Sequence, residues 1–188
     1  ARDIERDPEH VIEVLRAAES LDAEMLRRFE LLRTVDLPTL RLLSEQVRPR
    51  RFRRGETVVR AGEAGESMFF VNAGLVAAIV GGKEVELIRR GHFFGEIAFI
   101  AQVSKELDDA LHVGETSTVV FPTTRTADVV CREPCDLLEL HKGAVLGVVR
   151  SSPALYRALR RSLKTQARLR LERDALADDE RPPSPPPQ

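Results

Sequence analysis

The stretch most able to do chemistry is Phe-Phe-Gly-Glu-Ile-Ala at residues 93–98, which follows a run of strand-forming residues and a turn at Gly91. A helix that starts here would direct free backbone N–H groups outward, and these groups together with the helix dipole favour a bound phosphate. An acid beside a phosphate is repelled by it, so Glu96 is better suited to accept a hydrogen bond from a sugar hydroxyl. The pattern therefore predicts a site that takes a phosphate and a sugar hydroxyl together.

A second segment, Arg-Thr-Ala at residues 125–127, supplies the positive charge that such a site needs. Arg125 would offset the charge of the phosphate, and Thr126 adds a hydroxyl donor. For residues 93–98 alone, a solvated Glu96 and an Arg125 that only decorates an edge strand are an equally good interpretation. The wider pattern along the chain favours the binding site.

Regions of different periodicity must position these residues. Apolar residues recur at helical spacing between residues 11 and 47, and again between 145 and 176. Between them, residues 57–88 and 126–140 contain short runs rich in β-forming residues, with glycines separating those of the first stretch, which is typical of a β-sandwich or barrel. Residues 181–188 are dominated by proline and are expected to form a disordered tail.

One segment, residues 101–124, fits neither the helical nor the β pattern. Between Lys105 and Glu115 it carries four acids and one lysine, a net charge of −3. We expect an inserted surface loop with one helical turn, because loops of this length are uncommon unless they are functional or disordered. Its few apolar residues predict that it is dispensable for folding.

Composition excludes several classes of function. The 188 residues, with 43% hydrophobic and 31% charged residues, suit one soluble domain with helical additions. A net charge of −1 and the absence of Trp argue against nucleic-acid binding. Apolar runs are too short for a membrane helix, and two cysteines cannot build a disulfide framework, so we expect a cytoplasmic location. The chain starts at Ala1 without a signal-peptide pattern, which suggests a piece of a longer protein.

The remaining candidate sites are weak. Cys131 and Cys135 have no second pair to complete a zinc site, and the histidines show no metal spacing. No nucleophile motif or Walker-type loop is present, so enzymatic chemistry is not expected. The basic run at residues 48–54 is interpreted first as a solvated strand entry and second as a contact for an acidic partner or membrane surface.

Four ordered landmarks resemble the cyclic-nucleotide-binding domain family: residues 54–63, 68–74, 94–98 and 125–129. The resemblance extends from about Leu31 to Glu172. It implies an α+β fold, an eight-stranded-type, jelly-roll-like β-roll with N-terminal helices and two C-terminal helices. It also implies three parts: an N-terminal helical segment at 1–30, the binding domain at 31–180 with its inserted loop at 101–124, and the tail at 181–188.

The same resemblance implies roles for individual residues. Glu96 would bind the ribose 2′-hydroxyl, Arg125 would pair with the cyclic phosphate, and Thr126 would donate to the phosphate or the base. Two strand residues would pack on the base, and the last helix would cover it with residues near 168–171. The full set implied for ligand contact is Val85, Leu87, Phe94, Gly95, Glu96, Ile97, Ala98, Arg125, Thr126, Ala127, Arg168 and Leu171, with Phe94 better interpreted as core beside the site.

One departure from the family concerns the linker between the two halves of the site. Here 28 residues lie between Glu96 and Arg125, many more than the family's usual linker, and the excess corresponds to the acidic loop. Because loop entropy grows slowly with length, the roll can tolerate the insertion.

We therefore expect a sensor of cAMP or cGMP rather than an enzyme, with no metal and no cofactor beyond that ligand. The domain would regulate a larger protein, most like a cation channel, through movement of its last helix. Its partners would be the cyclic nucleotide and the effector part of that protein, with no nucleic acid and with a membrane only through a parent channel. The alternatives are the regulatory domain of a cyclic-nucleotide-dependent kinase and a docking module that uses the same fold without binding a nucleotide.

Overall fold

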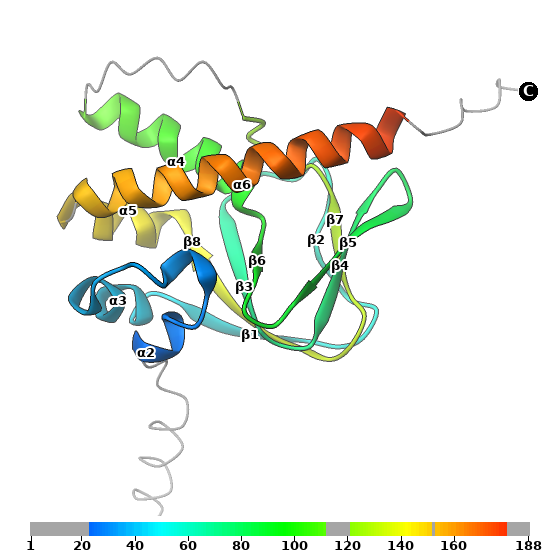
Figure 1. Ribbon diagram of the computed structural model, residues 1–188, viewed down its shortest axis with the longest axis horizontal. Coiled ribbons are helices and arrows are strands. Elements are labelled where there is room, and N and C mark those ends of the chain that lie inside the picture. The colour runs from blue at the N-terminus through cyan, green and yellow to red at the C-terminus, as the bar shows by residue number, and fades with distance from the viewer. Residues whose placement is uncertain (1–22, 112–120, 152, 180–188) are drawn as a thin grey trace, which may run out of the picture.

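Two β-sheets form a roll, and helices pack on it from both ends of the chain (Figure 1). The computed structural model describes residues 23–111, 121–151 and 153–179. Most of the expected helical segment at 1–30, residues 112–120 of the expected loop, and the proline-rich tail lie outside the described residues. No helix among the described residues is both long and apolar enough to cross a membrane.

The eight strands of the described residues form two four-stranded antiparallel sheets, which confirms the α+β roll. The first sheet has the order β1 (Arg48–Phe52), β8 (Cys135–His141), β3 (Ser67–Ala73) and β6 (Phe93–Phe94). The second has the order β2 (Thr57–Val59), β7 (Asp128–Cys131), β4 (Leu75–Val80) and β5 (Lys83–Arg89). Neighbours in each sheet are mostly distant in sequence, so the halves of the predicted site can meet only in the folded chain.

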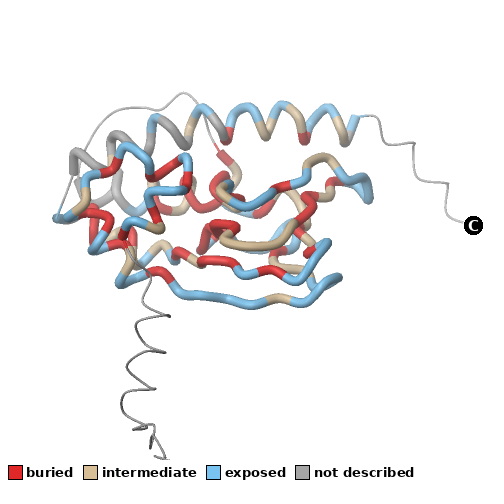
Figure 2. The backbone as a smooth tube through the Cα atoms, turned by 60° about the horizontal axis from the view of Figure 1, so that its bottom comes forward, coloured by how far each residue is buried: buried red, intermediate tan, exposed pale blue. Residues whose placement is uncertain are grey.

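Strand β3 has buried residues on both faces and joins two hydrophobic cores. Buried segments of the chain are red in Figure 2. Phe69 and Val71 point into the roll, where the ring of Phe69 stacks on that of Phe94 with 5.3 Å between centroids. Met68 and Phe70 point the other way, toward the helices. Because successive side chains of a strand alternate between faces, a continuous apolar run of this kind indicates a strand covered on both sides.

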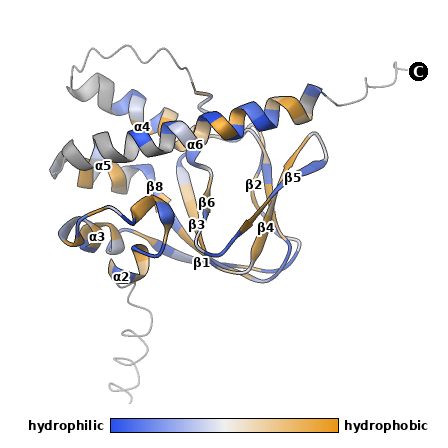
Figure 3. Ribbon diagram, in the orientation of Figure 1, coloured by the Kyte–Doolittle hydropathy of each residue, from blue (hydrophilic) through white to orange (hydrophobic). Residues whose placement is uncertain are grey.

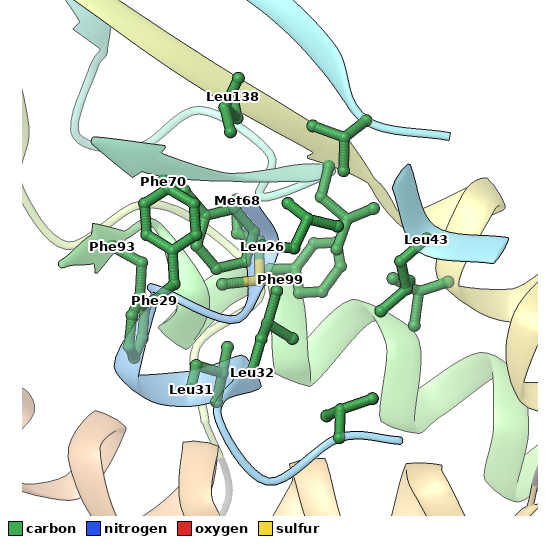
Figure 4. Close-up of a cluster of buried hydrophobic side chains, with 14 of the residues drawn as sticks. Leu26, Phe29, Leu31, Leu32, Leu43, Met68, Phe70, Phe93, Phe99 and Leu138 are labelled. Carbon is green, nitrogen blue, oxygen red and sulfur yellow. The ribbon is translucent and has the colours of Figure 1, made fainter. Parts of the chain in front are cut away.

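The helices before the roll are α2 (Ala23–Leu26), the 3-10 helix η1 (Glu30–Leu32) and α3 (Leu37–Ser44). Asp36 caps α3 by accepting hydrogen bonds from Thr39 N at 3.0 Å and Thr39 Oγ1 at 2.9 Å. Figure 4 shows how these helices bring apolar side chains onto β3, with the Phe29 and Phe70 ring centroids 4.8 Å apart. This packing fixes the N-terminal helices to the strand that also lines the roll.

Helix α4 (Glu96–Leu111) corrects the prediction of a surface loop at 101–124. Residues 101–111 continue the helix, and Val103, with 3% of its surface exposed, lies in the helical core beside Ile100. Phe121, at the other end of the expected loop, is also buried. The sequence analysis gave weight to the acidic residues and overlooked the apolar stripe formed by Phe99, Ile100 and Val103. Such a stripe is enough for an amphipathic helix, whatever the charge of the opposite face.

Two helices follow the roll as predicted, α5 (Lys142–Ser151) and α6 (Pro153–Asp179). Helix α6 is the longest element and runs across the roll from α4 to the β4–β5 hairpin (Figure 1). In the part of α6 that Figure 3 colours, hydrophilic residues alternate with hydrophobic ones. Leu169 and Leu176 are exposed, and Ala167 is buried. The position of α6 over the roll therefore depends largely on polar contacts.

The packing of two glycines predicts opposite effects on stability. A Cβ atom on Gly65 would lie 2.1 Å from Cβ of Ala98 in the first turn of α4, whereas one on Gly147 in α5 meets nothing within 4 Å. We expect Gly65→Ala to lower the free energy of unfolding by about 1–3 kcal/mol, and Gly147→Ala to raise it by about 0.5–1 kcal/mol. Urea unfolding of both variants measures this. A Gly65→Ala protein as stable as the parent would contradict the close approach of this loop to α4.

Candidate ligand-binding site

The turn between β6 and α4 begins the site. Gly95 adopts a positive φ of 82° and α4 starts at the next residue, Glu96. A Cβ atom on residue 95 would lie 2.7 Å from Nη1 of Arg125 and 3.3 Å from the carbonyl oxygen of Ser67. Glycine is therefore required both by the backbone angle and by the space. It lets the first turn of α4, residues 96–98, line a cleft in the roll.

Arg125 holds this turn in place from behind. The residue is 8% exposed, and its guanidinium donates to Gly95 O at 2.7 Å and to Ser67 O at 2.6 Å. Burial lowers its pKa, while Glu63, Glu96 and Glu139 act in the opposite direction. An arginine remains charged under such conditions, so the cleft contains a fixed buried cation beside the start of α4.

Glu96 is the most deeply buried acid of the cleft. Only 1% of its surface is exposed, and its Oε2 accepts from Nη1 of Arg170 on α6 at 2.7 Å. Its other oxygen, Oε1, is buried with no hydrogen-bond partner among the described residues. Burial raises the pKa of Glu96, and the positive charge of Arg170 opposes that rise. Such an orphaned acceptor is rare in native proteins and calls for a donor.

Helix α6 contributes three residues that the sequence analysis missed. Arg170 bonds Glu96 and also donates to Phe93 O at 2.8 Å. Arg173 pairs with Glu86 on β5, and Asp174 accepts from Thr126 Oγ1 at 3.1 Å. The three lie at i, i+3 and i+4, so they share one helix face. A sequence signal for these contacts existed. Two arginines and one acid lie on one face of the helix, and they are complementary in charge to the acids and the hydroxyl of the roll that they contact.

Together these residues line a cleft between the roll and α6. An apolar wall with a few convergent polar groups is typical of a site for a small organic ligand. Apolar residues of β2, β4, β5 and β7 form its wall, and charged residues of the first turn of α4, of the segment before β7 and of α6 form its polar end. Eight of the predicted residues line it: Phe94, Gly95, Glu96, Ile97, Ala98, Arg125, Thr126 and Ala127.

The two predicted residues of β5 do not line the cleft. Leu87 is 42% exposed, and Val85 packs against the roll core instead. Their neighbours Glu86 and Ile88 line the cleft in their place. Ala78 pairs with Glu86 while Ile79 pairs with Glu84, so Val85 is the extra residue of a β-bulge. A bulge shifts the alternation of side chains by one residue, and β propensity does not reveal where it falls.

The predicted lid residues of α6 also lie elsewhere. Arg168 is exposed and pairs with Glu172 one turn along the helix at 2.9 Å. Leu171 packs against the helical core, and Leu169 is exposed. The face of α6 that meets the cleft is the one carrying Arg170 and Asp174. The helix was predicted correctly, but the face that it turns toward the cleft was not, because the sequence analysis had not determined the rotation of α6 about its axis.

Metal or thiol chemistry finds no support in the described part of the chain. No group of three His, Cys, Asp or Glu residues there could hold a metal ion. Cys131 and Cys135 are buried free thiols, and burial raises the pKa of Cys131 to about 12. A thiol with so high a pKa is a poor nucleophile at neutral pH, so these residues serve packing.

Comparison with known proteins points to one family. Residues 49–110 match the family model of the cyclic nucleotide-binding domain. A cGMP-dependent protein kinase of Toxoplasma gondii is 33% identical over 49 residues, which are 26% of this chain and 5% of the kinase. A protein of Rhodopseudomonas palustris, provisionally named a potassium channel protein, is 31% identical over 96 residues, 49% of this chain and 23% of that protein. The chain thus spans a quarter or less of either relative.

A solved structure supports the fold. A protein of Geobacter metallireducens, provisionally named a cyclic nucleotide-binding protein, superposes with a TM-score of 0.61 at 14% identity over 80% of this chain and 98% of its own. The matched segment 49–110 begins in β1 and ends in α4, so it includes Gly95 and Glu96. The roll and the turn into α4 agree with the family match, so residues 49–110 of this chain are similar to the cyclic nucleotide-binding domain.

Proposed function

We propose that this domain is a regulatory sensor that binds a cyclic nucleotide between the roll and α6. The observation that carries the proposal is the unpartnered, buried Oε1 of Glu96 in a cleft that also contains Arg125 and the start of α4. A buried acceptor without a donor is costly, and a sugar hydroxyl from the ligand would satisfy it. The Glu96 carboxylate would then bind the sugar of the ligand, and the Arg125 cation would bind its phosphate.

The phosphate would lie against Arg125 and the first turn of α4. Helix N–H groups in a first turn have no partner inside the helix, and the helix dipole favours an anion there. Thr126, which follows Arg125 directly, offers a hydroxyl on the same side. The base would face the apolar wall formed by residues such as Ile88 and Val129. Both cAMP and cGMP match this distribution, and the proposal does not rank them.

Binding would be transmitted by α6, because that helix contacts both Glu96 and Thr126. The effector would be another part of a larger protein, and the names of the two relatives favour a channel or a kinase. We favour the channel on the resemblance of the sequence motifs. A docking module without nucleotide binding is less well supported, since such a module has no need for an orphaned buried carboxylate beside a buried arginine.

Arg125→Ala is expected to weaken binding of cAMP and cGMP more than any other single substitution. Removing a buried charged partner costs roughly 2–5 kcal/mol, at least about 30-fold in Kd. The variant should also unfold more easily, since Gly95 O and Ser67 O lose their donor. Calorimetric titration of folded protein measures the Kd, with Arg132→Ala as the control because Arg132 pairs with Glu84 outside the cleft. Binding within threefold of the parent would rule out the assigned phosphate contact.

The preference for a 2′-hydroxyl is expected to depend on pH through Glu96. The ionised carboxylate accepts from the hydroxyl, and burial raises the pKa of Glu96 above its ordinary value. The preference for cAMP over 2′-deoxy-cAMP should therefore be full above that raised pKa and fall as pH drops through it. By linkage, the folded protein binds this proton more tightly than the unfolded chain, so this group alone adds stability as pH falls through the same range.

Paired titrations with the two nucleotides across pH measure this effect, with Glu96→Gln as the matched control. The Gln variant should show a weak preference that does not change with pH. A parent protein that binds both nucleotides equally at every pH would remove Glu96 from the sugar site.

Arg170 is expected to keep Glu96 ionised. Its charge opposes the raised pKa of Glu96, so Arg170→Gln should raise that pKa further and move the loss of 2′-hydroxyl preference to higher pH. Arg170→Lys should restore most of the parent profile, because it returns the charge. The same paired titrations apply. If the Gln and Lys variants shift the profile equally, Arg170 acts through its shape and its bond to Phe93 O rather than its charge.

A further inference from the structure

One contact between α6 and the cleft opposes the proposed ligand. Asp174 is 6% exposed, and its Oδ2 accepts the hydrogen bond of Thr126 Oγ1 at 3.1 Å. Thr126 adjoins Arg125, so it lies on the side of the cleft where the phosphate would bind. A hydroxyl has one proton to donate. Thr126 therefore cannot donate to Asp174 and to a phosphate oxygen at the same time.

The charges around the cleft sharpen this conflict. Oδ1 of Asp174 accepts from Nε of Arg173 at 2.8 Å, and the same guanidinium also pairs with Glu86 on β5. Arg170 is likewise shared, between Glu96 at 2.7 Å and Glu86 at 3.5 Å. The charged residues that line the cleft are three cations and three acids: Arg125, Arg170, Arg173, Glu86, Glu96 and Asp174. With all six ionised, no positive charge is left over for an added anion.

Resting on the proposed function, we propose that Asp174 is a competitor built into α6: it holds Thr126 in place of the ligand phosphate and thereby sets the affinity of the site. A cyclic nucleotide gains the Thr126 hydroxyl only by displacing a carboxylate that carries the same sign of charge. Repulsion between two anions a few ångströms apart is large where water is partly excluded.

Displacement of Asp174 has a consequence for α6. Asp174 and Arg173 are adjacent and hydrogen-bonded to each other, so moving one disturbs the pair between Arg173 and Glu86. Arg170 lies one turn earlier and keeps its own bonds to Glu96 and Phe93 O. The ligand would then loosen the end of α6 from residue 173 onward while the helix stays attached at Arg170. Capture of the phosphate is in this way coupled to release of the end of α6.

Calorimetric titration of Asp174→Asn tests the competition. Asparagine keeps the shape of the side chain but removes its charge, and its amide can donate to a phosphate. We expect cAMP and cGMP to bind about tenfold more tightly than to the parent. Adenosine and guanosine carry no phosphate, so their affinities should change by less than about twofold. Equal gains for the nucleotides and the nucleosides would overturn the proposal, since Asp174 would then act on the opening of the cleft rather than on the phosphate.

Two controls fix the interpretation. Asp179→Asn removes one acid from an exposed position on the same helix and should leave all four affinities within about twofold of the parent values. In a Thr126→Val background, Asp174→Asn should improve nucleotide binding less than it does in the parent, because the shared hydroxyl is gone and only the change of charge still contributes. A gain as large as in the parent background would contradict competition for Thr126. Thermal melts monitored by circular dichroism confirm that each variant is folded.

Hydrogen exchange gives an independent measurement on the parent protein. Saturating cAMP should increase exchange at amides 173–179 while those near Arg170 stay protected. Reduced exchange across 173–179 would overturn the proposal, as would unchanged or weaker nucleotide binding by Asp174→Asn.

The titrations also separate this proposal from the proposed function. If the parent binds and Asp174→Asn binds equally well, the role of Asp174 as a competitor is wrong, while the proposed sensor function is retained. If neither protein binds cAMP or cGMP at millimolar concentration, the proposed function and the competitor both fail. Binding by the variant alone supports both.

Discussion

The arrangement of the cleft depends on how one buried cation is satisfied. Arg125 donates to the carbonyl oxygens of Gly95 and Ser67, and its backbone bonds Glu63 O at 2.8 Å and Gly62 N at 2.9 Å. A charge in this position is tolerated only with such hydrogen bonds. These bonds tie the start of α4, the start of β3 and the loop before it to the segment that precedes β7. The start of α4, which carries Glu96, is in this way held next to the segment that carries Thr126.

The described parts of the long link between Glu96 and Arg125 belong to the helical framework. The extended α4 places Val103 in the helical core, and Phe121 returns to the same core just before Arg125. Lys142 at the start of α5 pairs with Glu66 at 3.2 Å and with Glu106 on α4 at 2.9 Å. The helix that begins at the cleft is therefore fixed to the other helices at Val103 and Glu106. A shift of its first turn would be transmitted to α5 and α6 through packed side chains rather than through a flexible loop.

Sequence reasoning succeeded where local chemistry determines local structure. Gly95 followed by Glu96 predicts a turn into a helix because few residues but glycine adopt the required φ. Short β runs separated by glycines predicted a sandwich or barrel, and the resemblance to the family implied the roll. It failed where two arrangements differ only in rotation or register. Val85 and Leu87 have the strand propensity expected of the wall, but the bulge that turns Glu86 and Ile88 inward leaves no mark in propensity. On α6, charged residues lie all around the helix, so periodicity could not tell Arg170 and Asp174 from Arg168.

The charged contacts of α6 also explain why this helix suits the proposed regulatory role. A helix held by an apolar stripe stays in place whatever charge arrives nearby, because hydrophobic burial is non-directional and insensitive to a distant ion. The end of α6 over the cleft is held differently: Arg170, Arg173 and Asp174 pair with Glu96, Glu86 and Thr126, while Leu169 and Leu176 are exposed. Such partly buried pairs are balanced against desolvation and respond to any change in local charge. Contacts of this kind make the position of α6 depend on what occupies the cleft, and an anion is the occupant to which they are most sensitive.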